Sequence, residues 1–92
     1  VNIVKNKNNE VLLIVADGMG GHEAGEVASS IAVNHVSEKF SNLAFLGNRE
    51  EAIEWIKDTV SEANVKIYEY TKSHPESEGM GTTIVLAIYT KE

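Results

Sequence analysis

Cysteine is absent from this 92-residue chain, and so is any apolar run long enough to cross a membrane. Without cysteine no disulfide can stabilise the fold, which fits a protein that works inside the cell. The chain also lacks a signal-like apolar stretch, so neither a membrane span nor export is indicated. Internal repeats and low-complexity tracts are absent as well. These absences predict a globular protein of the cytoplasm.

Basic residues are few: eight Lys and Arg oppose 14 Asp and Glu, which gives a net charge of −6. A surface of this sign repels nucleic-acid backbones and anionic lipids, so we expect neither nucleic acid nor a membrane as a partner. The same charge repels phosphate. A phosphate-handling site on this chain would therefore have to import positive charge.

The hydrophobic fraction of 42% is typical of a globular chain, and the pattern of those residues predicts five elements. A Gly-rich run follows the apolar stretch 11–16. Asn48 and Glu51 have the spacing of a helix capping box, which marks the start of the second helix. Pro75 marks the end of that helix. The expected elements are strands at 1–6 and 11–16, helices at 23–41 and 49–72, and a strand at 82–89.

The order β-β-α-α-β predicts an α+β fold with an opening hairpin, an antiparallel helix pair packed on the strands, and a final strand. Strands 11–16 and 82–89 have apolar residues at both odd and even positions, which is typical of strands buried on both faces. One helical layer covers only one of those faces. We therefore expect residues 1–92 to form a single unit that is a piece of a larger domain, or one that associates with a second copy through exposed strands.

The run Asp17–His22 carries the most specific chemistry in the chain. A plain structural turn is one interpretation, because Asp-Gly is a common hairpin signal. A phosphate cradle is a second, but neither the dinucleotide-binding nor the P-loop pattern is present. The third is a divalent metal site, in which Asp17 is an oxygen ligand at the end of a strand and Gly18 turns its carbonyl toward the same ion.

Two segments resemble a known family. Residues 11–28, which contain Asp-Gly-Met-Gly-Gly-His, are similar to the metal-binding strand and first helix of bacterial PP2C-type (PPM) protein serine/threonine phosphatases. Residues 79–83, Gly-Met-Gly-Thr-Thr, resemble the family's second signature. The resemblance covers nearly all of this chain, whereas the family's domain is well over twice as long. It implies that the chain is part of an α-β-β-α sandwich.

The resemblance also implies site residues and a cofactor. Asp17 would bridge two Mn²⁺ or Mg²⁺ ions, and the carbonyl of Gly18 would bind one of them. Water activated by the ions would hydrolyse phosphoserine or phosphothreonine, which agrees with the lack of a cysteine nucleophile. Met19 stands where many eukaryotic members carry a histidine, and His22 is the candidate that could act as general acid in its place. Thr82 and Thr83 are candidates for hydrogen bonds that support Asp17, although they are also ordinary strand residues.

Family segments with a phosphate-binding Arg and with further metal carboxylates have no counterpart in residues 1–92. One carboxylate and one carbonyl hold two Mg²⁺ ions poorly, so we expect this segment alone to be inactive. The expected partners are phosphorylated proteins and a cognate Ser/Thr kinase. The alternative function is a non-catalytic binding or regulatory module on the same scaffold.

Overall fold

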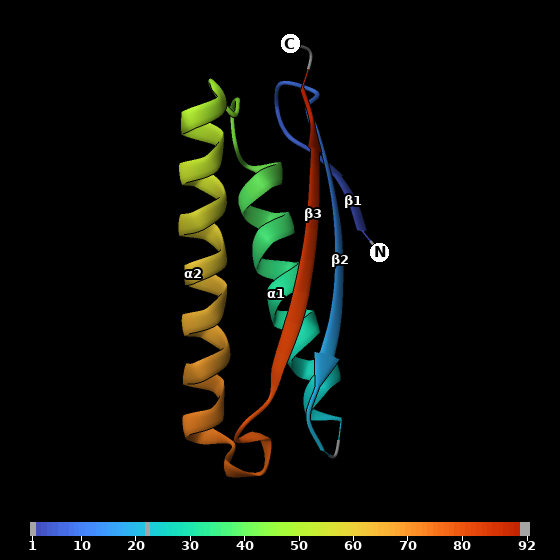
Figure 1. Cartoon of the computed structure of the whole chain (residues 1–92), viewed down its shortest axis with the longest axis vertical. Coiled ribbons are helices and arrows are strands. Elements are labelled where there is room, and N and C mark those ends of the chain that lie inside the picture. Colours follow the sequence, from blue (N-terminus) through green and yellow to red (C-terminus); the bar gives the residue numbers. More distant parts are fainter. Residues whose placement is uncertain (1, 22, 91–92) are drawn as a thin grey trace.

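The computed structural model describes residues 2–21 and 23–90. Its elements follow the predicted order, with β1 at Asn2–Lys5, β2 at Val11–Met19, α1 at Ala24–Ser41, α2 at Arg49–Ser73 and β3 at Gly81–Tyr89. A short 3₁₀ helix, η1, spans Pro75–Ser77 inside the stretch expected to be a loop. The two helices and the sheet run along the same long axis (Figure 1). The predicted α+β architecture is confirmed.

The three strands form one antiparallel sheet in the order β1-β2-β3. The first two make the expected hairpin, with Lys5 paired to Val11 across a turn in which Asn9 has a φ of 60°. Asparagine tolerates this left-handed conformation better than most residues. The central strand β2 then pairs with β3 along the whole of its length, from Val11 opposite Tyr89 to Met19 opposite Gly81.

Among the described residues, the helices cover only one face of this sheet, as expected for a single helical layer. Leu12 and Ile14 are completely buried, whereas Val15 and Val85 are 38% and 65% exposed. Successive side chains of a strand point to opposite faces, and both helices lie on one side of the sheet. We call the uncovered side the open face; its exposed large hydrophobic residues are Ile3, Val15, Met19, Val85 and Tyr89.

Helix α1 supplies most of the cover for the other face. Its buried residues recur at steps of four, as an amphipathic helix requires. They are small where the helix begins and larger toward its end, where Val36 and Phe40 pack in one cluster with Leu12 and Ile14. The series of buried side chains is Ala24, Ala28, Ala32, Val36 and Phe40.

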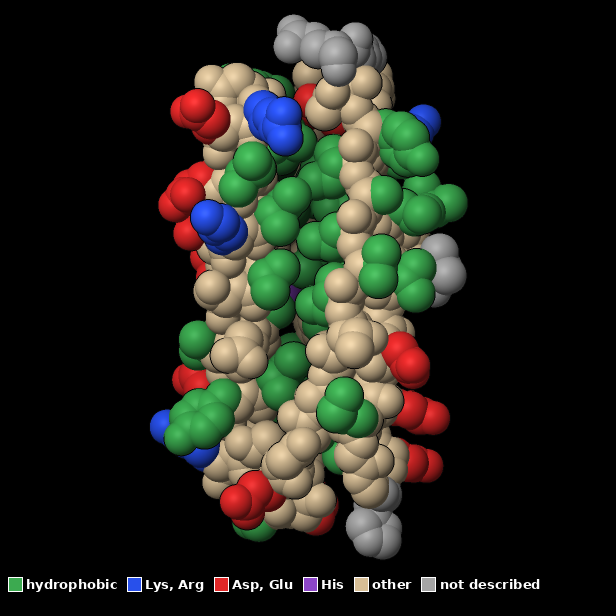
Figure 2. All heavy atoms as spheres, in the orientation of Figure 1, with side chains coloured by type: hydrophobic (Ala, Val, Ile, Leu, Met, Phe, Trp, Pro, Cys, Tyr) green, Lys and Arg blue, Asp and Glu red, His purple; other side chains and the backbone are tan. Residues whose placement is uncertain are grey.

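Helix α2 begins with the predicted capping box. The Asn48 side chain accepts a hydrogen bond from the Glu51 amide at 2.8 Å, and the Glu51 carboxylate accepts one from the Asn48 amide at 3.1 Å. The helix packs mainly against α1 and not flat on the strands as expected (Figure 1). Hydrophobic side chains are therefore visible in the furrow between α2 and β3 (Figure 2).

The chain returns to the sheet through residues 74–80. Pro75 follows the last residues of α2 and begins η1, as its restriction on the preceding residue predicts. Met80 is buried against the start of α1, which brings β3 alongside β2. Across residues 2–21 and 23–90, neither helix has the length and hydropathy that crossing a membrane requires.

Candidate functional site

Asp17 lies inside strand β2 and not on a turn after it. The strand continues three residues beyond its predicted end at Ala16, to Met19. The reason is a partner that the local sequence does not reveal, because Gly81, Thr82 and Thr83 of β3 pair with Met19, Gly18 and Asp17. Asp17 is exposed, and alternation along β2 places its carboxylate on the open face, at the end of the sheet where α1 begins.

Gly18 is held against the start of α1 by a contact between two backbones. A Cβ built on Gly18 would lie 1.7 Å from the carbonyl oxygen of Gly25, and one built on Gly25 would lie 2.8 Å from the carbonyl carbon of Gly18. No side chain fits at either position. This contact gives Gly18 a structural role besides any role of its carbonyl, and sequence reasoning missed it, although four glycines at positions 18, 20, 21 and 25 were its signal.

The connection between β2 and α1 is tight for the same reason. Gly20 has a φ of 144°, and a Cβ there would lie 3.0 Å from the Cβ of Ala24 and 3.2 Å from that of Met80. Glu23, which precedes the helix, has a φ of 67°. This left-handed conformation is uncommon for a residue with a side chain. His22, the candidate general acid, lies outside the described residues.

Thr83 is directly opposite Asp17 in the β2–β3 pair, on the same face of the sheet. Its hydroxyl donates a hydrogen bond of 3.3 Å to the backbone carbonyl of Asp17 and not to the carboxylate. Thr82 is opposite Gly18 and therefore on the helix side, and its hydroxyl donates to the carbonyl of Thr83 at 2.9 Å. Of these two threonines, only Thr83 is beside Asp17 on the open face.

The Asp17 carboxylate is available to an external ligand. Within the part of the chain that the structure describes, no hydrogen bond or ion pair engages this carboxylate, and no group of three His, Cys, Asp or Glu side chains is placed to hold a metal ion. The described residues thus offer one exposed hard oxygen ligand at the end of a sheet. This donor fits Mg²⁺ or Mn²⁺ chemically but supplies only a fraction of the coordination that such an ion needs.

The family model for protein phosphatase 2C matches residues 1–92, the whole chain. The chain belongs to the protein phosphatase 2C family. It is 44% identical over 86 residues to the serine/threonine phosphatase stp of Listeria monocytogenes, an alignment that covers 94% of this chain and 34% of that protein. It is 36% identical over 89 residues to protein phosphatase PhpP of Streptococcus pneumoniae, covering 96% of this chain and 35% of that one.

Solved structures of the family have the same fold over this region. Serine/threonine phosphatase Stp1 from Staphylococcus aureus superimposes with a TM-score of 0.87 at 36% identity, over 98% of this chain and 35% of that one. The serine/threonine phosphatase of S. agalactiae gives a TM-score of 0.86 at 36% identity, over 97% of this chain and 36% of that one. The predicted membership in the family and the sheet-and-helix-pair architecture are both confirmed.

The chain spans about a third of the length of these relatives. Asp17 lies on the uncovered face itself, so any group that completes its coordination has to approach from that side.

Proposed function

We propose that residues 1–92 form a portion of a metal-dependent protein serine/threonine phosphatase, in which Asp17 is a ligand of the catalytic metal centre. The observation that carries the proposal is the exposed Asp17 carboxylate on the open face, opposite Thr83, in a chain that belongs to the protein phosphatase 2C family. The names of the Listeria monocytogenes and Staphylococcus aureus relatives, both serine/threonine phosphatases, suggest the reaction, hydrolysis of phosphorylated serine or threonine.

In this proposal the Asp17 carboxylate and the Gly18 carbonyl would hold Mn²⁺ or Mg²⁺. When bound, two such ions supply activation of the attacking water and neutralisation of the phosphoryl charge. They would also offset the net charge of −6, which otherwise repels a phosphorylated substrate. The chain's own contribution is to fix Asp17: β2 is paired on one side with β3, and Gly18 is locked against Gly25.

Thr83 is proposed as a positioning residue for Asp17. Its hydroxyl bonds the Asp17 carbonyl, so it restrains the backbone from which the carboxylate extends. Thr82, on the other face, would act through Thr83, because its hydroxyl bonds the Thr83 carbonyl. His22 is kept as the proposed general acid. Because a general acid works only when it is protonated, a His22→Ala variant is expected to lose the basic limb of the pH–rate profile.

The activity assay uses p-nitrophenyl phosphate and Mn²⁺ with the purified protein that contains this segment. Loss of a group that only supports a metal ligand typically lowers metal affinity or activity by about 10- to 100-fold. Asp17 is proposed as a ligand itself, so Asp17→Asn is expected to lower kcat by at least about 100-fold. Asp58→Asn makes the same chemical change at an exposed position on α2 and is the matched control. Equal activity of both variants would reject the proposed role.

A segment of residues 1–92 without other parts of a phosphatase is expected to be inactive, because it supplies one carboxylate for two ions. The same assay on that segment tests the point, and metal-dependent turnover by the segment would contradict it. The alternative, a non-catalytic binding or regulatory module on this scaffold, predicts instead that even the complete protein hydrolyses no phosphoester.

The open face is proposed to pack against a second sheet, as the α-β-β-α sandwich requires. A second copy of the chain is the other candidate to cover Val15, Val85 and Tyr89, since an apolar patch of this kind is normally an interaction surface. Light scattering after size-exclusion chromatography separates the two, because only self-association makes the apparent mass rise with concentration. The remaining proposals are a cytoplasmic location, phosphoprotein substrates and a cognate Ser/Thr kinase as a partner.

A further inference from the structure

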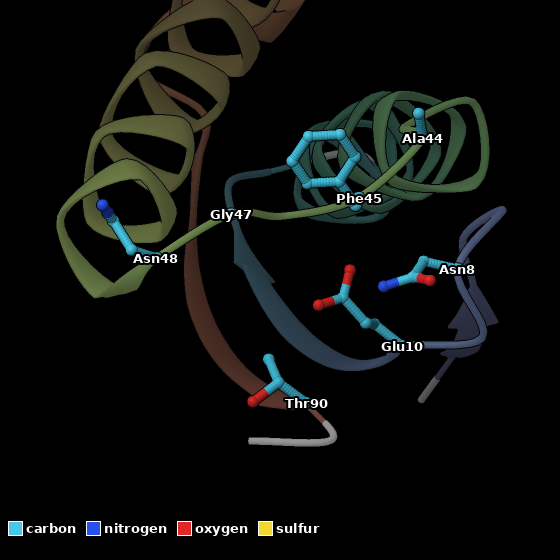
Figure 3. Close-up of a pocket in the computed structure, with 7 residues that line it drawn as sticks. All are labelled: Asn8, Glu10, Ala44, Phe45, Gly47, Asn48 and Thr90. Atoms are coloured by element: carbon cyan, nitrogen blue, oxygen red, sulfur yellow. The ribbon is translucent and has the colours of Figure 1, made fainter.

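A pocket lies at the opposite end of the sheet from Asp17. It has a volume of ≈ 570 Å³ and is lined by the β1–β2 turn, the connector between the helices, and Thr90 after β3. Glu10 immediately precedes β2, so seven residue steps of nearly extended chain, about 23 Å, separate it from Asp17. The pocket is therefore independent of the candidate metal site. Figure 3 shows the Glu10 carboxylate directed into it, toward the connector.

Glu10 is unusual because its side chain is buried although it carries a charge. It is only 6% exposed. Its Oε1 accepts two hydrogen bonds of 2.8 Å, one from Nδ2 of Asn6 and one from the backbone amide of Leu46. Both donors are neutral, and both use the same oxygen. Among the described residues, no hydrogen bond occupies Oε2, which is left to face the pocket.

The Glu10 charge also lacks a cationic partner among the described residues. Buried carboxylates are normally paired with a cation, because the loss of water around a charge is costly. Within residues 2–21 and 23–90, the ion pairs connect only α1 and α2 and do not involve Glu10. Among the described residues that line the pocket, Glu10 is the one with a formal charge. A buried carboxylate in such a lining favours a positively charged ligand over a neutral or anionic one.

The other residues that line the pocket determine which kind of group can accompany the cation. Ala44 and Phe45 of the connector form an apolar rim, and Phe45 is 62% exposed although it is a large hydrophobic residue. The methyl group of Thr90 points into the pocket from the opposite side (Figure 3). An alkyl chain fits such walls.

We propose that this pocket binds a primary alkylammonium group, with the cation at Oε2 of Glu10 and its alkyl stem between Phe45 and Thr90. The group has two potential sources, a free alkylamine or the side chain of a lysine in a polypeptide. The volume of ≈ 570 Å³ accommodates either, because it lies within the range of small-molecule sites.

The test is a titration of the purified ¹⁵N-labelled protein, followed by two-dimensional NMR. The probes are n-butylammonium for the free amine, a short lysine-containing peptide for the polypeptide, and the same peptide with norleucine as the neutral isostere. The expected result is saturable shifts concentrated on the amides of Leu46, Gly47 and Glu10, with affinity at least about 10-fold weaker for norleucine. Saturation by n-butylammonium alone assigns the site to free amines, and saturation by the lysine peptide assigns it to polypeptides.

Glu10→Gln is the decisive variant. Its side-chain oxygen still accepts the hydrogen bonds from Asn6 and Leu46, but the charge is removed, so a loss of affinity of at least about 10-fold is expected. Glu76→Gln, an exposed position on η1, is the control for net charge. Equal affinity of the Glu10 variant, equal affinity for norleucine, or shifts scattered over the acidic surface would each overturn the proposal. The norleucine comparison keeps the test valid on the unmodified protein if the variant fails to fold.

Discussion

Gly18 of β2 and Gly25 of α1 are in backbone contact, and neither has room for a methyl group. This pair sets the distance between the sheet and the first turn of the helix. It also fixes the strand position next to Asp17, so the geometry of the candidate metal ligand depends on two residues without side chains.

Gly18→Ala is therefore expected to destabilise the protein strongly. The added methyl would meet the Gly25 carbonyl at 1.7 Å, a distance that forces α1 away from β2. Overpacking of this kind costs typically 1–3 kcal/mol, and a clash with backbone belongs at the upper end, about 3 kcal/mol. Urea denaturation followed by circular dichroism measures the change in the free energy of unfolding.

Gly21→Ala is the matched control for that prediction. A Cβ at Gly21 meets nothing within 4 Å, although the residue belongs to the same Gly-rich run. The expected change in the free energy of unfolding is within about 0.5 kcal/mol, as for ordinary surface positions. Similar losses in the two variants would show that the run is generally intolerant of side chains and that the Gly18–Gly25 contact is not special.

Asn48→Ala tests the start of α2. The substitution removes the oxygen that accepts the Glu51 amide at 2.8 Å, and loss of such a cap costs about 1 kcal/mol. Glu50→Gln is the control, because Glu50 is in the same first turn but outside the capping box. Thermal unfolding should give a lower midpoint for Asn48→Ala than for Glu50→Gln. Equal midpoints for the two variants would be inconsistent with the hydrogen bonds described.

The ion pair between the helices makes a pH-dependent contribution to stability. The hydrogen bond from His35 at 2.9 Å, aided by Lys39 at 3.5 Å, lowers the pKa of Glu62 below its ordinary value of 4.5. Because the folded-state pKa is the lower one, this stabilisation is present above the unfolded-state value and disappears as the pH falls through the folded-state value.

Glu62→Gln is accordingly expected to destabilise the protein at about pH 6 and to have a smaller effect at about pH 3. The contribution is small at any pH because Glu62 is exposed to water and salt. Chemical denaturation at the two pH values compares the variant with Glu54→Gln, another exposed glutamate of α2. A difference from wild type that is equal at both pH values would contradict the pKa shift.

Features determined by short-range chemistry could be predicted from the sequence. The capping box depends on residues three apart, and the β1–β2 turn depends on asparagines within it. The stop at Pro75 is likewise a local steric effect.

Features that depend on residues far away in the sequence could not be predicted in this way. The end of β2 was placed at Ala16 because Asp-Gly is a turn signal, whereas pairing with Thr82 and Thr83 keeps those residues in the strand. The role of Glu10 was hidden for the same reason, since its partner Leu46 is 36 residues away.

The central claim is that Asp17 binds a divalent metal, and isothermal titration of the purified protein with Mn²⁺ tests it most directly. Wild type and Asp58→Asn are expected to bind Mn²⁺ alike, while Asp17→Asn is expected to bind at least about 10-fold more weakly, because a carboxylate ligand is lost. Circular dichroism spectra of the three proteins should agree, because Asp17 is exposed. Indistinguishable Mn²⁺ affinities for wild type and Asp17→Asn would contradict the account.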